Sequence, residues 1–96
     1  MMWEDLHTTG TMGSENGTIL LDEEYKKACR ITLEKCERYY AITCGIYGGM
    51  VHTAFADNDH YREKYEAMKK ELQDFIDKTT SAAEEVAFYD AFAAKY

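Results

Sequence analysis

The sequence predicts an α+β fold, in which an antiparallel β-meander of about three strands packs against C-terminal helices. Two observations carry this prediction. Residues 39–56 alternate β-branched and aromatic residues with small or polar ones, around the pair Gly48-Gly49. After Ala56 the apolar spacing changes from about two residues to about 3.6, which indicates that a hairpin leads into a helical layer.

The chain has 96 residues, enough for one small domain with a single core. We expect residues 1–21 to form a flexible leader and residues 22–96 a single α+β domain. Gly10, Gly13 and Gly17 interleave with Thr, Ser and Asn in the leader, a composition typical of loops. The run 19–21 could form an edge strand or an anchor.

Charge and cysteine content exclude several classes of protein. The formal charge of −7 argues against binding to nucleic acid or to an anionic membrane surface. No apolar run approaches the length of a membrane span, and no signal peptide is visible. An odd number of cysteines, without a close pair, favours reduced thiols in a cytoplasm.

Residues 22–36 allow two interpretations. As a helix, the segment would be capped by Asp22 and favoured by its acidic start. As a strand it alternates cleanly, and one face carries Cys29, Ile31 and Leu33. We favour a short helix or turn through Lys27, followed by a strand from about Ala28 to Lys35.

The glycine pair predicts the register of the hairpin. With Gly48 and Gly49 at the two central positions of a tight turn, Ile46 faces Val51 and Cys44 faces Thr53. In this register one face of the hairpin collects the mostly apolar residues expected in a core: Tyr40, Ile42, Cys44, Ile46, Val51, Thr53 and Phe55. A change of one residue in the loop length would turn every side chain of the second strand to the other face of the sheet.

Two helices are expected after the hairpin. Residues 57–78 carry one apolar stripe, which consists of Tyr61, Tyr65, Met68, Leu72, Phe75 and Ile76. Ser81 and Glu84 form a capping box that opens a last helix, 81–96. The apolar residues of this last helix cover more than one stripe, so the helix can pack against two partners, one of which could be a second subunit. A homodimer through the sheet edge or the last helix is therefore one expectation.

No set of residues predicts catalysis or a metal centre. In the register above, Cys44 and His52 lie on opposite faces, which excludes a nucleophile and base in contact. Cys29, Cys36, Cys44 and His52 lack the short spacing of a zinc site. We therefore predict no catalytic residue, no metal and no cofactor.

The second sheet face is the one candidate binding site. Arg30, Thr43, Tyr47 and His52 would project from it together, beside Thr32. Arginine offers a fixed fork for an anion, and histidine exchanges protons near neutral pH. The alternative is a plain polar face, partly covered by the last helix, with Arg30 paired to Glu34 or another acid.

Three strings carry a resemblance: Arg30-Ile31-Thr32-Leu33-Glu34, Ala41-Ile42-Thr43-Cys44-Gly45-Ile46-Tyr47-Gly48 and Met50-Val51-His52-Thr53. Together with Met68-Lys69-Lys70, they resemble a family of small, uncharacterised bacterial proteins that have a hairpin followed by an amphipathic helix. The resemblance covers about residues 28–76. It implies a bacterial or phage protein and supports the strand interpretation, but it implies no activity.

We therefore expect a small cytoplasmic domain for protein interaction or regulation, without catalytic activity. The alternative is a small-ligand (anion) binder or minor enzyme that uses the polar sheet face around Arg30 and His52. A protein partner or self-association is expected, and nucleic acid and membranes are not.

Overall fold

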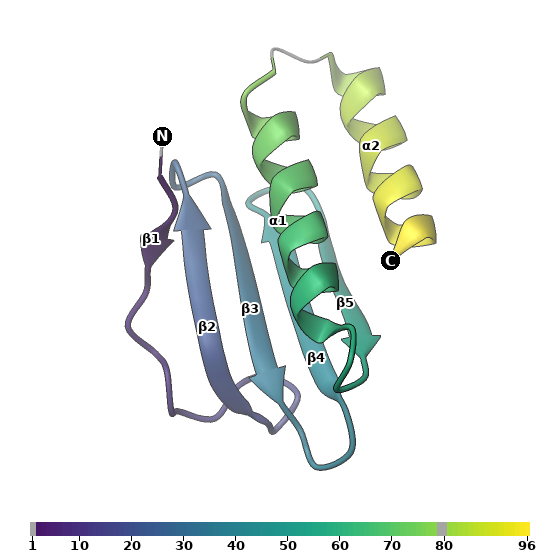
Figure 1. The fold of residues 1–96 in the computed structure, drawn as a ribbon. Coiled ribbons are helices and arrows are strands. Elements are labelled where there is room, and N and C mark those ends of the chain that lie inside the picture. Colours follow the sequence, from purple (N-terminus) through teal and green to yellow (C-terminus); the bar gives the residue numbers. More distant parts are fainter. Residues whose placement is uncertain (1, 79–80) are drawn as a thin grey trace.

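The computed structural model describes residues 2–78 and 81–96. It has an α+β fold in which two helices cover one face of a five-stranded antiparallel sheet (Figure 1). The strands lie in chain order, and each pairs with its neighbour in the sequence. In order along the chain, the elements are β1 (Glu4–Asp5), β2 (Thr18–Tyr25), β3 (Cys29–Lys35), β4 (Tyr40–Ile46), β5 (Val51–Ala56), α1 (Tyr61–Ile76) and α2 (Ala82–Lys95).

The sheet has five strands where about three were predicted. The segment 1–21, of which residue 1 lies outside the described residues, supplies β1 and the first four residues of β2. The short helix or turn predicted through Lys27 is wrong for residues 22–25, because β2 continues to Tyr25, and of the predicted segment only Lys26 and Lys27 lie in a turn. Its acidic residues find partners on neighbouring elements: Asp22 pairs with Arg30, Glu23 with Lys69, and Glu24 with the Tyr47 hydroxyl. Such tertiary contacts outweigh local helix propensity.

The turn between β2 and β3 is formed by two lysines. Lys26 and Lys27 have φ of 51° and 54°, and Ala28 N–H donates to the Tyr25 carbonyl at 2.9 Å. Two successive residues at positive φ are what a type I′ turn requires, although Asn and Gly are its usual residues. The strand predicted from about Ala28 to Lys35 is confirmed as β3.

The predicted register of the β4–β5 hairpin is wrong by one residue. Ile46 and Met50 close the hairpin through a backbone bond of 2.9 Å, so the loop contains Tyr47, Gly48 and Gly49. Gly48 has φ of 77° and Gly49 N–H donates to the Ile46 carbonyl, an arrangement that fits a type II turn. Because side chains alternate along a strand, this single extra residue reverses the faces of β5.

The core lies between the sheet and the helices. β4 contributes the predicted residues Tyr40, Ile42, Cys44 and Ile46, but Val51 and Phe55 point away and are 82% and 52% exposed. Ala54 is buried in their place. The core is completed by Tyr25, Cys29, Ile31, Leu33, Tyr65, Met68, Leu72 and Phe92.

The two helices confirm the sequence prediction, with small changes at their starts. The first begins at Tyr61, because the Asp57 carboxylate accepts the backbone N–H of Asp59 and His60 and holds this segment in a turn. The second begins after Ser81, with both bonds of the capping box to Glu84 present. Within residues 2–78 and 81–96, neither helix is long and apolar enough to cross a membrane.

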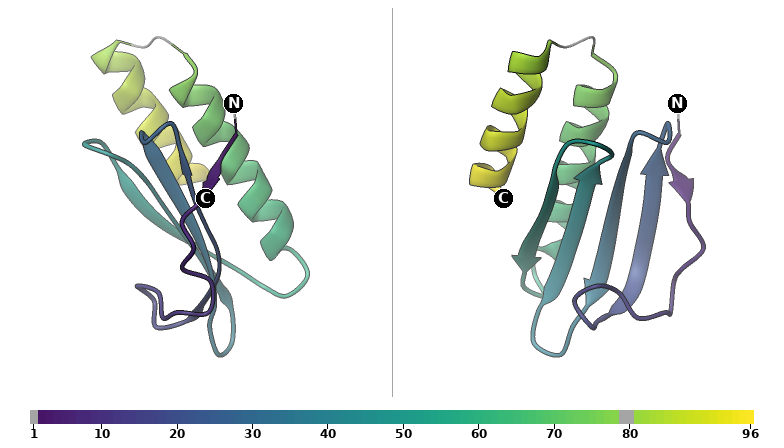
Figure 2. Two further views of the ribbon diagram at one scale, coloured as in Figure 1. Left: turned by 90° about the vertical axis from the view of Figure 1, so that its left-hand side faces the viewer. Right: turned by 180° about the vertical axis from the view of Figure 1, so that it is seen from behind.

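The chain before β2 contacts both layers of the fold. Trp3 Nε1 donates to Gln73 on α1 at 3.0 Å, and its ring lies 5.1 Å from that of Tyr25. Residues 6–11 then run beside β2, through backbone bonds from Leu6 to Asp22 and from Gly10 to Ile19. Residues 12–17 form a loop that crosses the end of the sheet on the face away from the helices (Figure 2).

The Lys26-Lys27 turn predicts a stabilising substitution. Replacing Lys27, which is exposed, with glycine removes the steric cost of a side chain at positive φ. We expect Lys27→Gly to raise the free energy of unfolding by about 0.5–1 kcal/mol, measured by urea denaturation. The control Lys35→Gly places glycine in a strand and is expected to lower it by a similar amount. Destabilisation by both variants would contradict the turn geometry.

Candidate functional site

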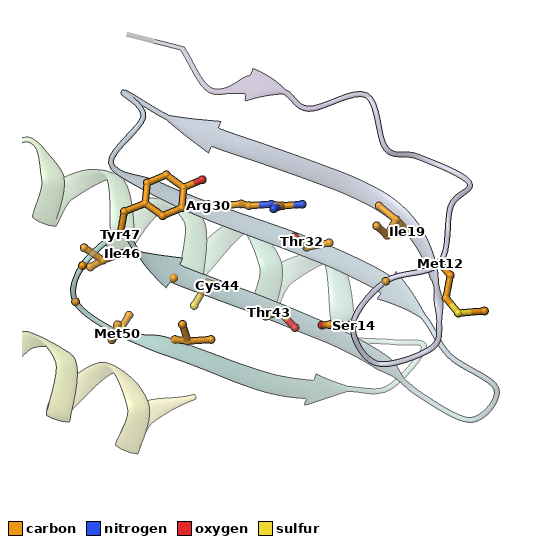
Figure 3. A pocket seen from close by; sticks show the side chains of 15 residues that line it. Met12, Ser14, Ile19, Arg30, Thr32, Thr43, Cys44, Ile46, Tyr47 and Met50 are labelled. Atoms are coloured by element: carbon orange, nitrogen blue, oxygen red, sulfur yellow. The ribbon is translucent and has the colours of Figure 1, made fainter.

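A concave pocket of about 600 Å³ lies on the sheet face that the helices leave open. Its floor is formed by Thr32, Thr43 and Gly45 (Figure 3). Residues 12–14 of the crossing loop close one end, and Tyr47 and Met50 lie at the other. Three of the four predicted ligand-binding residues line this pocket: Arg30, Thr43 and Tyr47.

Arg30 is held in place by a buried carboxylate. Its Nε and Nη2 donate to the two oxygens of Asp22 at 2.8 and 2.6 Å, a bidentate pair. Asp22 is 1% exposed and also accepts from the Thr8 and Thr32 hydroxyls. Burial alone would raise the pKa of Asp22, but the bonds from Arg30, Thr8 and Thr32 outweigh it, so the pKa lies below its ordinary value. The charge of Arg30 is therefore largely compensated.

The hydroxyls of Tyr47 and Thr43 are also engaged. The Tyr47 hydroxyl donates to Glu24 at 2.6 Å, and desolvation together with this bond raises the pKa of Tyr47 to about 12. The phenol is therefore protonated at neutral pH and is not a base. The Thr43 hydroxyl lies 3.3 Å from that of Thr53 on β5. The pocket thus offers orienting groups and apolar surface rather than reactive ones.

A second buried carboxylate holds the crossing loop against the sheet. Glu34 is 0% exposed, and its Oε1 accepts the backbone N–H of Glu15 at 3.1 Å and of Gly17 at 3.2 Å. A side chain at Gly13 would overlap the Glu34 carboxylate, so glycine is required where the loop passes over it. Glu34 Oε2 is buried and has no hydrogen-bond partner among the described residues.

His52, the fourth predicted ligand-binding residue, lies on the opposite face. Its ring is edge-on to Phe92 of α2, with 6.1 Å between centroids. Its Nε2 is buried without a hydrogen-bond partner in the described part of the chain. The cause is the shift in the β4–β5 register, which also places His52 directly opposite Cys44. The premise that these two residues lie on opposite faces is therefore wrong.

The pairing of His52 with Cys44 across the two strands does not make Cys44 a nucleophile. Cys44 is 2% exposed, and burial raises its pKa to about 12. Burial likewise raises the pKa of Cys29 to about 11. Nucleophilic attack needs the thiolate, and neither residue supplies it near neutral pH. Cys36 lies beyond the end of β3, and no group of three or more metal-ligating side chains occurs within the described residues.

Sequence reasoning missed Asp22, Glu34 and the crossing loop. The sequence predicts Asp22 as a helix cap, and Glu34 or another acid as the partner of Arg30. In the structure that partner is Asp22. The last helix packs on the other face, so the loop covers part of the polar face instead. The glycines at 13 and 17 were a signal for a tight loop, but nothing in the sequence placed it over Glu34.

Comparison with known proteins identifies no relative. No protein family model, no curated protein sequence and no solved structure matches this chain.

Removing Arg30 is expected to destabilise the fold. Arg30→Met keeps the aliphatic stem but leaves the buried Asp22 carboxylate without a cation. Breaking a fully buried pair costs about 3–5 kcal/mol; because the Arg30 side chain is 45% exposed and solvent screens it, we expect a loss of about 2 kcal/mol. The measurement is urea denaturation. Lys26→Met, which breaks the exposed pair with Asp77, is the control, and an equal loss in both variants would contradict a special role for Asp22.

The same pair predicts how stability depends on pH. The pKa of Asp22 is depressed in the folded protein, so its contribution is present above the ordinary value of 3.8 and is lost as the pH falls through the folded-state pKa. We expect the difference in unfolding free energy between wild type and Asp22→Asn to be largest near neutral pH and to narrow below about pH 4. Denaturant titrations across this range measure it. A difference that stays constant at all pH values would refute the depressed pKa.

Proposed function

We infer that this chain is a non-catalytic protein-interaction domain, and that the pocket on the open sheet face receives an apolar side chain of a protein partner. The observation that carries this inference is the concave, largely apolar surface on the sheet face opposite the helices. An open sheet face in a domain of this size is a natural contact surface, since exposed apolar concavities in proteins are usually binding sites.

The state of the polar groups supports binding over catalysis. Arg30 and Thr32 are bonded to Asp22, and Tyr47 to Glu24. The groups with reactive side chains, Cys44 and His52, belong to the helix-covered face. Contact with a partner would therefore rest on burial of apolar surface around a polar rim, as in the central part of protein interfaces.

Charge indicates the chemistry of the partner. The chain carries a formal charge of −7, and the Glu24 carboxylate accepts from the hydroxyl of Tyr47, which lines the pocket. Complementary charge speeds association and excludes partners of the wrong sign. The preferred partner is thus a segment with an apolar anchor flanked by Lys or Arg.

Filling the pocket tests this function. Random linear peptides displayed on phage would be selected against the protein, and synthetic copies measured by fluorescence polarisation. We expect selected peptides to combine an apolar anchor with basic residues. Thr43→Phe, which places a ring over the pocket floor, should weaken their binding at least about tenfold.

The control variant adds the same ring elsewhere. Glu66→Phe is placed on the exposed side of α1 and should bind the peptides as wild type does. Failure to select any peptide, or equal binding to Thr43→Phe, would refute the proposal.

A second candidate is a site for a small ligand that carries a hydrogen-bond acceptor or a negative charge. It is favoured by the size of the pocket and by Arg30 Nη1, which makes no hydrogen bond among the described residues. Because Asp22 compensates the charge of Arg30, the case for a negatively charged ligand is weaker than the case for a neutral one. Ligand-observed NMR with small carboxylates and neutral amides distinguishes it: binding that Thr43→Phe removes would support this candidate, and no binding would exclude it.

A further inference from the structure

The outer edge of β5 has the features of a surface for pairing with another strand. β5 lies at one end of the strand order, and its sequence Val-His-Thr-Ala-Phe-Ala contains no Asp, Glu, Lys, Arg or Pro. Its register with β4 has no bulge. Natural proteins protect exposed edges with charges, proline or bulges. The opposite edge is protected in this way, because β1 is only two residues long and both are acidic.

The backbone groups that point out of this edge can be identified. Ile46 N–H donates to the Met50 carbonyl, so every second residue from Met50 onwards is bonded to β4. Val51, Thr53 and Phe55 therefore direct their N–H and C=O groups outwards. The position of Lys64 agrees with this assignment, because its Nζ donates to the outward Phe55 carbonyl at 3.0 Å.

We propose that a second copy of this chain pairs antiparallel with β5 about a two-fold axis at Thr53. In this register Thr53 faces Thr53 of the partner subunit, and Val51 faces Phe55 of the partner subunit. All three outward-facing residues then exchange backbone hydrogen bonds, and the Phe55 carbonyl uses its second lone pair beside the bond from Lys64 Nζ. The two sheets become one continuous sheet, with the helices of both copies on the same side.

The distribution of charge favours a second copy as the occupant. Two molecules of formal charge −7 repel each other over most of their surface. The edge and its open-face neighbours, Tyr39, Thr43, Gly45, Val51, Thr53 and Phe55, carry no charge of their own. The charged group bonded to this edge is the Lys64 ammonium on the Phe55 carbonyl, and its sign is opposite to the net charge of a second copy. Across the axis, an exposed valine would meet an exposed phenylalanine, a favourable cross-strand pair.

The last helix extends this surface. α2 lies on the same side of the molecule as β5 (Figures 1 and 2). Ala83, Val86, Ala87 and Ala94 of this helix are exposed, and its exposed charged residues are Glu84, Asp90 and Lys95. By contrast, the outer side of α1 is rich in Lys, Arg and Glu. The proposed interface goes beyond the pocket function, because it uses a backbone edge rather than the pocket floor.

Cysteine cross-linking tests the register directly. In a Cys36→Ser background, Thr53→Cys is expected to form a disulfide-linked dimer under mild oxidation, because facing residues have Cα atoms about 5.5 Å apart. Val51→Cys alone should not, since the two copies of this residue lie on the order of 13 Å apart. Mixing Val51→Cys with Phe55→Cys should restore the cross-link.

Light scattering and sedimentation equilibrium test the dimer itself. We expect a dimer for wild type, and at least a tenfold higher dissociation constant for Phe55→Lys, which sets a charge in the apolar pair. Tyr47→Lys, at a similarly exposed site on the same face but away from the edge, should remain dimeric.

A monomer from micromolar to millimolar concentration would overturn the proposal. So would a dimer that Phe55→Lys leaves intact and Thr53→Cys does not link, because its interface would lie elsewhere. Neither result affects the peptide measurement with Thr43→Phe, so this inference and the pocket function can fail independently.

Discussion

The three-residue turn Tyr47–Gly49 determines the arrangement of the whole β5 strand. It pairs Ile46 with Met50, and every later pair in the hairpin follows from that one. His52 and Ala54 are thereby directed towards the helices, whereas Val51, Thr53 and Phe55 face the open side. The same turn brings Tyr47 to the end of the pocket. Both proposed surfaces depend on this one local geometry.

Two buried carboxylates organise the open face. Asp22 orients Arg30 and receives Thr8 from the N-terminal segment, and Glu34 binds two backbone N–H groups of the crossing loop. Each carboxylate therefore ties a segment of irregular chain to a regular strand. Buried polar groups need hydrogen-bond partners, so the bonds to Glu34 Oε1 position the loop that closes one end of the pocket.

The sequence was sufficient for the elements with strong local signals. The apolar stripe of α1, the capping box at Ser81 and the alternation of β3 and β4 depend on contacts between near neighbours in the chain. The α+β class follows from them. Arg30, Thr43 and Tyr47 were placed together for the same reason, since β3 and β4 pair residue by residue.

The conformation of residues 22–27 and the position of His52 depend on contacts that no local sequence pattern reveals. Asp22-Glu23-Glu24 has the composition of a helix start, and its strand conformation rests on Arg30, Lys69 and Tyr47. The predicted position of His52 is wrong because a glycine pair is compatible with loops of two or three residues. The apolar residues Val51 and Phe55 favour the two-residue loop, which would bury them, whereas the structure leaves both exposed. Lys26 and Lys27 gave no turn signal, because lysine seldom adopts positive φ.

The strand order has a consequence for how the chain folds. Because each strand pairs only with the one before or after it, the sheet can grow hairpin by hairpin without closing a long loop, and loop-closure entropy opposes it little. Contacts across the longest separations, such as Trp3 with Gln73 and Tyr25 with Asp77, join the N-terminal part to α1. They can form only once that helix has docked, so the single tryptophan reports the docking of α1 rather than the pairing of the strands.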